Sequence, residues 1–246
     1  MSTRRIVRVT GTVMLVAGVA VLVWVLVVWR WQDPFTALYT TWKQHQLSQS
    51  YDRRARAFRL PGPSSKTASA RVVTAGQIRA VAHRYRLESK RGQAVGRLRV
   101  PRLGLNMVVV DGTDEGSLKK GPGLDRRTYM PGEGQLVYIA GHRTTYLAPF
   151  AHIERMKAGD PVTLEVPYGT FRYRVFTHRI VNANELAVLH SHGREIVELQ
   201  ACHPRFFASQ RYIVYARLME IEPRGAPSIR APSRTLAAAP LASAQG

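Results

Sequence analysis

The most prominent hydrophobic pattern is a long apolar run near the N-terminus. Residues 9–29 read VTGTVMLVAGVAVLVWVLVVW and include no charged residue. A helix needs about 20 apolar residues to cross a bilayer core, whereas a cleavable signal peptide has an apolar region of only ~7–15 residues. The run is followed by Arg30, Trp31 and Gln32 and not by a small-residue cleavage site. We therefore expect residues 9–30 to be an uncleaved transmembrane signal anchor.

The residues at the two ends of this span predict its orientation. Arg4, Arg5 and Arg8 precede it, and the positive-inside rule places such residues in the cytoplasm. Tryptophans gather at its far end, where aromatic rings favour the membrane interface. We expect a single-pass plasma-membrane protein with residues 1–8 in the cytoplasm and the rest of the chain outside the membrane.

Residues 31–93 have the pattern of a membrane-proximal helix and a linker. Asp33 and Pro34 have the form of a helix start, with Asp as the N-cap and Pro at the first helical position. The sequence LPGPSSKTASA then breaks any periodicity and predicts a linker. Thr74 is the expected N-cap of a second helix that ends near Gly92.

From Val95 onward, short apolar runs separated by turn residues predict β-strands. The runs are VGRLRV, LNMVVV, QLVYIA, PVTLEV, FRYRVFTHRIV, REIVELQA and RYIVYARL. Several short strands of this kind favour an all-β barrel or sandwich. After Ile221 the chain is rich in Pro, Ala and Ser, so we expect residues 222–246 to be a disordered tail.

Charge narrows the choice of partners only slightly. The 246 residues include 36 Lys and Arg against 16 Asp and Glu, a formal charge of +20. Such a surface attracts polyanions such as nucleic acid, anionic lipid or acidic wall polymers. No aromatic-rich nucleic-acid motif is present, so we expect no nucleic-acid partner and expect lipid contact through residues 9–30. A non-catalytic basic membrane tether stays open as an alternative.

The single cysteine is the first sign of chemistry. Cys202 has no partner for an internal disulfide, and an unpaired thiol outside the membrane is a candidate reactive group. It closes an apolar run before Pro204, where a strand must end. A nucleophilic thiol needs a base, and His142 also follows a strand and a glycine. Arg211 opens the last apolar run and offers a cation for an oxyanion.

Other polar residues suggest weaker candidates. Arg143 and Arg205 are near the expected site in sequence and are possible substrate contacts. His190 and His192 have no third ligand in view, and the acidic residues of 111–115 lack the alternation of a calcium loop. We therefore assign no metal and no cofactor.

Several motifs in order now match a known family. They are GTDEGSLKKGPG at 112–123, PGEGQ at 131–135, IAGHRTTY at 139–146 and ELQACHP at 198–204, followed by Arg211. From about Val95 to Leu218 the chain resembles the catalytic domain of sortases, particularly the housekeeping class E type of actinobacteria.

The resemblance implies a closed eight-stranded β-barrel with short helices over residues 94–221. It also implies a cysteine transpeptidase that cleaves an LPxTG-like or LAxTG-like sorting signal between Thr and Gly. In that reaction Cys202 is the nucleophile, His142 transfers the proton and Arg211 stabilises the oxyanion. The implied partners are secreted proteins that carry the signal and an amine of the cell wall.

One departure from the family pattern concerns the residue before the cysteine. Sortases usually have Thr there, whereas this chain has Ala201, and Glu198 occupies the first position of the same motif. We expect Ala201, together with Ala140 and Arg143, to contact substrate, so that the change at 201 affects motif preference or rate.

Two further enzyme alternatives rest on short motifs. Ser191-His192-Gly193 resembles part of an L,D-transpeptidase motif, but Arg194 stands where the cysteine nearly follows in that family. Asp33-Pro34-Phe35 has the form of the lid of pilin-polymerising sortases, yet it lies far in sequence from the barrel. Helix capping is the simpler interpretation of that motif.

Overall fold

The computed structural model describes residues 3–31, 34–60 and 73–231. Its α-helices are α1 Thr3–Trp31, α2 Pro34–Ala57, α3 Ala75–Glu88 and α4 Glu115–Leu118, and its 3₁₀ turns are η1 Pro101–Leu103, η2 Ile153–Arg155 and η3 Leu186–Leu189. The strands are β1 Ala94–Val100, β2 Leu105–Asp111, β3 Gly123–Leu124, β4 Leu136–Ala140, β5 Pro161–Val166, β6 Gly169–Asn182, β7 Ile196–His203, β8 Gln210–Pro223 and β9 Ile229–Arg230.

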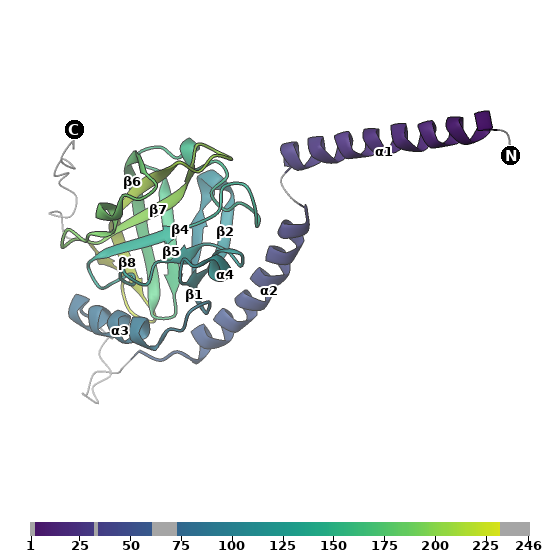
Figure 1. Cartoon of the computed structure of the whole chain (residues 1–246). Coiled ribbons are helices and arrows are strands. Elements are labelled where there is room, and N and C mark those ends of the chain that lie inside the picture. The colour runs from purple at the N-terminus through teal and green to yellow at the C-terminus, as the bar shows by residue number, and fades with distance from the viewer. Residues whose placement is uncertain (1–2, 32–33, 61–72, 232–246) are drawn as a thin grey trace.

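The first eight strands form a closed barrel (Figure 1). Their order is β6-β5-β1-β2-β3-β4-β7-β8. Pairing of β6 with β8 closes the ring, and β9 pairs with the C-terminal part of β8. Closure leaves no unpaired edge between those strands. The predicted all-β fold, an eight-stranded barrel with short helices, is therefore confirmed.

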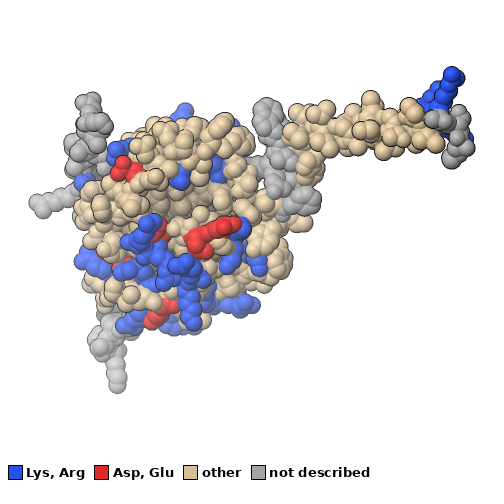
Figure 2. Space-filling model, in the orientation of Figure 1, with Lys and Arg blue, Asp and Glu red and all other residues tan. Residues whose placement is uncertain are grey.

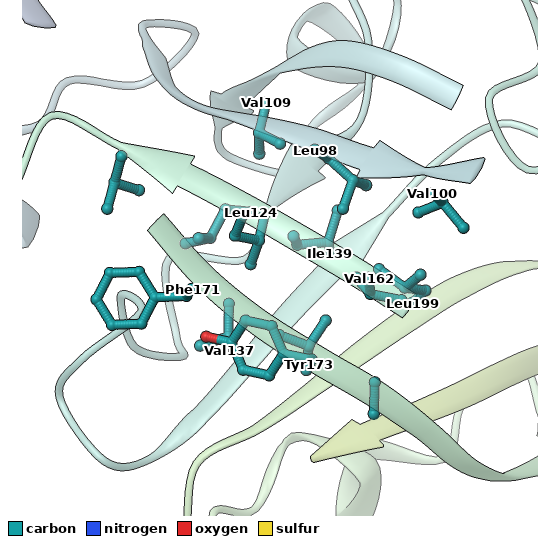
Figure 3. Close-up of a cluster of buried hydrophobic side chains, with 14 of the residues drawn as sticks. Leu98, Val100, Val109, Leu124, Val137, Ile139, Val162, Phe171, Tyr173 and Leu199 are labelled. Atoms are coloured by element: carbon teal, nitrogen blue, oxygen red, sulfur yellow. The ribbon is translucent and has the colours of Figure 1, made fainter. Parts of the chain in front are cut away.

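Alternation along the strands fills the barrel with aliphatic and aromatic side chains. Figure 3 shows this interior, where Leu98, Ile139 and Leu199 come from three different strands and are fully buried. Every second residue of a strand points to the same face, so the opposite face of the same strands is free to carry polar groups.

Each apolar run that predicted a strand coincides with one, but two short strands were missed. β3, which begins at Gly123, the last residue of the GTDEGSLKKGPG motif, pairs with β2 and β4. β9 pairs with β8 through Ile221 and Ile229. Two-residue strands have no period from which they can be recognised.

The expected disordered tail, 222–246, begins too early and is corrected here. β8 continues to Pro223, which pairs with Gly169 of β6. The chain then turns at Gly225, whose φ is +71°, and returns as β9. Residues 232–246 lie outside the described part of the chain.

α1 is long and apolar enough to cross a membrane, by length and composition, over Arg4–Val27. It extends away from the barrel in Figure 1, and its described side chains are largely exposed. The helix therefore contains the whole of the predicted span, residues 9–30.

α2 is not a free stalk, because it lies along β1 and β2 (Figure 1). The Gln44 amide donates to the carbonyls of Val108 and Lys120 and accepts from Val108 N. Tyr51, one of the buried residues of this interface, donates to the Glu165 carbonyl at 2.9 Å. The folded unit thus includes residues before 94, the expected start of the domain. The predicted Asp33 cap lies outside the described residues.

α3 covers one end of the barrel and begins after Thr74, the predicted N-cap. Thr74 and Gln77 form a capping box at its start, and Ile78 and Ala82 are fully buried against the core. The helix ends at Glu88, somewhat before the expected Gly92, and Ser89 N donates to the carbonyl of Tyr85.

The positive charge is concentrated on part of the surface. Figure 2 shows Lys and Arg gathered over the lower half of the barrel on the face in view, with fewer Asp and Glu among them. Such a surface attracts acidic polymers or anionic lipid.

A fully buried carboxylate joins the PGEGQ loop to the barrel. Glu195 accepts hydrogen bonds from the N–H groups of Gly132 and Gly134 at 3.0 Å and from the Tyr173 hydroxyl at 2.6 Å. A buried carboxylate is costly unless such donors satisfy it. The three donors make the loop part of the core.

Replacing Tyr173 with Phe removes one of these donors without changing the ring. Burial raises the pKa of Glu195 to about 7, so the acceptor is only partly charged at neutral pH. We expect Tyr173→Phe to lower the free energy of unfolding by about 0.5–3 kcal/mol, the range between a neutral and a charged hydrogen bond. Urea unfolding of the full chain in detergent measures this. Tyr129→Phe, at a partly exposed tyrosine, is the control and should change stability by less than about 0.5 kcal/mol. Equal effects of the two variants would contradict the assignment.

Candidate active site

The site lies at the C-terminal ends of two neighbouring parallel strands, β4 and β7. β4 and β7 pair in parallel with Ala140 opposite Gln200, and Gly141 N donates to the Gln200 carbonyl at 3.0 Å. Parallel strands end at the same edge of a sheet. The chain therefore delivers His142 and Cys202, each two residues beyond this pair, to the same end of the barrel.

β8 brings the third predicted residue to the same place. It runs antiparallel to β7, and Arg211 is paired directly with Cys202. One cavity of about 290 Å³ is lined by His142, Cys202 and Arg211, and Ala140 also lines it. The structure thus places the three predicted catalytic residues and one predicted substrate contact around a single pocket.

The rest of the pocket is formed by three groups of residues. Its apolar lining comes from Leu118, Val181, Ala183, Leu186, Val188 and Leu189. Polar lining residues include Thr113, Tyr138, Glu185 and Gln200, together with the Asp125 and Arg127 pair. Arg127 binds the Asp125 carboxylate through two side-chain bonds of 3.0 and 2.7 Å. The charges of Asp125 and Arg127 in the pocket lining are therefore paired with each other.

Ala201 does not face this pocket, which corrects its predicted role as a substrate contact. Its side chain is fully buried in the barrel core with Val197 and Leu199. The reason is the two-residue alternation of β7, which turns Gln200 and Cys202 to the other face. A threonine at position 201 would therefore place its hydroxyl in the core.

Arg143 is also not in the pocket lining, so its predicted substrate contact is corrected as well. The side chain is buried, and Nη1 donates to the Cys202 carbonyl at 3.1 Å and lies 3.0 Å from His203 Nδ1. Nη2 donates to Glu154 at 2.7 Å. Arg143 thus links the end of β7 to η2 and holds the backbone carbonyl of Cys202.

His142 is held by tight packing on either side. Phe150 N donates to the His142 carbonyl, and a Cβ at Gly141 would lie 2.6 Å from the Phe150 ring. The imidazole packs on Tyr146, with 5.1 Å between ring centroids. Nε2 is buried and has no hydrogen-bond partner among the described residues. A nitrogen of this kind is available to a reacting group.

The surroundings of His142 favour its neutral form. Burial lowers the pKa of the imidazole from its ordinary value, the Lys119 cation lowers it further, and Glu115 opposes them. Lys119 and Glu115 form an ion pair beside the loop. A neutral imidazole can accept a proton from a neighbouring thiol, so His142 fits the role of a general base.

Arg211 is fixed by the loop that follows the cysteine. Its Nη1 donates to the carbonyls of Ala208 at 2.8 Å and Gln210 at 2.9 Å. That loop includes Phe206 and Ala208 with φ of 77° and 56°, and Phe206 is exposed. Backbone carbonyls therefore restrict the guanidinium of a residue that lines the pocket.

The comparisons with known proteins bear on this arrangement. Residues 98–219 match the model of the sortase domain family. The chain belongs to the sortase family. Sortases are cysteine transpeptidases, and the matched segment of this sortase contains the residues that surround the pocket.

The individual relatives are distant. The chain is 32% identical over 130 residues to Sortase D of Bacillus subtilis, covering 51% of this chain and 64% of that protein. It is 25% identical over 149 residues to Sortase SrtE1 of Streptomyces coelicolor, covering 54% and 42%. A Sortase D5 transpeptidase of Clostridium perfringens shares the fold, with a TM-score of 0.56, 19% identity and coverage of 72% of this chain and 98% of that one.

The motifs behind the two enzyme alternatives do not lead to a second site. Ser191 belongs to the loop before β7, where its hydroxyl bonds to Gln135 and accepts from Leu136 N at 3.1 Å. The DP-aromatic motif begins at Asp33, which lies outside the described residues.

Sequence reasoning noted Glu198 only as a departure from the family motif. In the structure it is buried between Tyr138 and Tyr215 on the outer face of β7, on the same side as Cys202. Burial raises the pKa of Glu198 to about 8, and Arg179 opposes this. Oε2 has no hydrogen-bond partner among the described residues.

This buried acid predicts a pH-dependent stability. Because the folded chain holds the Glu198 proton up to about pH 8 and the unfolded chain releases it near its ordinary pKa of about 4.3, stability falls as pH rises between those values. One differential proton gives at most about 1.4 kcal/mol per pH unit. We expect Glu198→Gln to reduce this fall, measured by urea unfolding at pH 5 and pH 8.

The matched control is Glu222→Gln, since Glu222 is a half-exposed carboxylate of β8 paired with Arg172. It should keep the wild-type pH dependence. If Glu198→Gln also keeps it, the raised pKa is wrong.

Proposed function

We propose that this sortase is a membrane-anchored cysteine transpeptidase that cleaves an LAxTG-like or LPxTG-like sorting signal between Thr and Gly. The observation that carries the proposal is the meeting of His142, Cys202 and Arg211 around one pocket at the end of the β4 and β7 pair. A nucleophile, a proton carrier and a cation are the groups that acyl transfer needs.

The reaction has two halves with opposite proton movements. The Cys202 thiol passes its proton to His142, and the resulting thiolate attacks the Thr carbonyl carbon. The C–N bond to Gly then breaks as His142 donates that proton to the departing amine. A thioester remains on Cys202. A wall amine then attacks the thioester carbon and gives a proton to His142, and the Cys202 thiolate leaves. Arg211 stabilises the negative oxygen of both tetrahedral intermediates.

The pocket lining supports a small aliphatic substrate segment. Leu118, Val188 and Leu189 give the cavity an apolar side next to Ala140. A cavity of about 290 Å³ lies near the lower limit of ligand pockets. We propose that the Leu and the following Ala or Pro of the signal bind against this apolar side.

The proposed setting is the outer face of the plasma membrane. Arg4, Arg5 and Arg8, at the N-terminal end of α1 and before its apolar run, favour an N-terminus in the cytoplasm, so the barrel and its pocket lie outside. Substrates are then secreted proteins that carry the signal, and the acceptor is an amine of a wall peptide. Lipid is contacted through residues 9–30.

Class E remains our proposal for the type of sortase. The motifs around His142 and Cys202 and the 25% identity to SrtE1 support it, whereas the 32% identity to Sortase D supports a class D enzyme. The relative rates with LAxTG and LPxTG peptides test the proposed motif directly.

The first experiment traps the thioester with hydroxylamine. The full chain in detergent is incubated with each peptide and hydroxylamine, and hydroxamate is detected by mass. We expect Cys202→Ala to abolish product, His142→Ala to lower the rate by about 10²–10⁴-fold and Arg211→Ala by about 10²–10³-fold. The full chain is required because a fragment from 94 to 222 lacks α2, α3 and β9.

His45→Ala is the control, since His45 is an exposed histidine of α2, and it should keep wild-type activity. Product formation by Cys202→Ala, or no product from a folded wild type with either peptide, would reject the proposed reaction.

The ion pair beside His142 predicts opposite shifts of the pH profile. Removing the cation in Lys119→Met raises the pKa of His142, because Lys119 lowers it, and Glu115→Gln lowers that pKa, because Glu115 raises it. The limb of kcat/KM governed by His142 should therefore move to higher pH in the first variant and to lower pH in the second. A shift in the same direction in both variants would contradict this account.

A further inference from the structure

The first turns of α2 contact the loop that carries His142. Tyr146 N donates to Thr36 Oγ1 at 3.1 Å. The ring of Tyr39 meets the ring of Tyr146 edge-on, with 6.5 Å between centroids, and Tyr146 in turn packs on His142. A continuous series of contacts therefore joins the membrane-proximal helix to the imidazole.

The same helix holds the segment on the other side of His142. Thr40 is fully buried and its hydroxyl donates to the Lys119 carbonyl at 2.9 Å. One turn later, Gln44 donates to the Lys120 carbonyl at 2.7 Å. Lys119 carries a charge that acts on His142, so α2 holds both the loop of the imidazole and the backbone of this lysine.

The loop itself needs such support. Tyr146, Leu147 and Ala148 have φ values of 53°, 61° and 37°, a region that non-glycine residues seldom occupy. Such backbone costs on the order of 1–3 kcal/mol per residue and persists only when its surroundings hold it. The Thr36 bond lies at the first of these residues, where it opposes relaxation of the loop.

We propose that α2 is a positioning element of the active site, in which Thr36 and Tyr39 hold Tyr146 against His142 and thereby keep the imidazole at the pocket. The membrane-proximal helix is then required for catalysis and does not serve only as a tether. The rate effect rests on the proposed transpeptidase function, but the geometry of the His142 loop does not.

The test substitutes the hydroxyl that accepts from Tyr146. In the full chain in detergent micelles, Thr36→Val removes the acceptor and keeps the shape, while Thr36→Ser restores the acceptor. Thr41→Val is the matched control, because the Thr41 hydroxyl is exposed and donates to Ala37 of its own helix. The first readout is kcat and KM for hydroxamate formation.

We expect Thr36→Val to lower kcat by about tenfold, as small displacements of a catalytic group do, with KM changed by less than about twofold. Thr36→Ser and Thr41→Val should stay near wild type. Tyr39→Ala, at a partly exposed position, removes the ring contact and should reproduce the loss. It also tests the proposal if Thr36→Val does not fold.

A second readout does not depend on the proposed reaction. The rate of Cys202 alkylation by iodoacetamide is measured against pH. The other charged or titratable groups around His142 are not substituted in these variants: Glu115 and Lys119 at the two ends of α4, Tyr146 of the loop, and Arg211 of the pocket lining. A loosened loop admits water to His142 and moves its pKa up toward the ordinary value, since burial is the main cause that lowers it. The His142 inflection should move to higher pH in Thr36→Val and Tyr39→Ala only.

The outcomes separate the two proposals. No hydroxamate from wild type, together with a shifted alkylation profile in Thr36→Val, rejects the transpeptidase function and supports the positioning role. Hydroxamate from wild type, together with Thr36→Val and Tyr39→Ala that match Thr41→Val in kcat and in the alkylation profile, overturns the positioning role.

Discussion

The parallel pairing of β4 with β7 is the contact on which the site depends. Because these strands run in the same direction, His142, two residues past β4, and Cys202, near the end of β7, lie at one edge of the sheet although they are far apart in sequence. β8 returns antiparallel to β7 and sets Arg211 opposite the cysteine. Closure of the barrel between β6 and β8 then fixes this edge, because no strand in the ring is free to slide.

Around that edge, alternation decides which residues take part in chemistry and which in folding. Neighbours in β7 have opposite surroundings: Ala201 is in the core and Cys202 is at the pocket. The outer face of the same strand also holds Glu198, an acid buried between tyrosines. This face therefore contains buried polar groups as well as the residues that line the pocket. Polar groups there are tolerated because the core on the other side of the sheet is almost wholly apolar.

Much of the fold followed from periodicity, and the family motifs indicated the residues that line the pocket. The roles of Ala201 and Arg143 did not follow, because the face to which a side chain points depends on strand register. β3 and β9 were too short to show a period. The docking of α2 was hidden for another reason: its contact stripe includes Thr40, Gln44 and Tyr51, which act mainly by hydrogen bonds to backbone and not by an apolar pattern.

The short connection between α1 and α2 limits how far the pocket stands from the bilayer. Three Cα steps of 3.8 Å join Trp31 to Pro34, about 11 Å at full extension, and Thr36, in the first turn of α2, already touches the loop of His142. If α1 spans the membrane, as proposed, the loop of His142 therefore lies close to the lipid headgroups. A polypeptide still held in the same bilayer needs only a short stretch of chain outside it to reach the thiol.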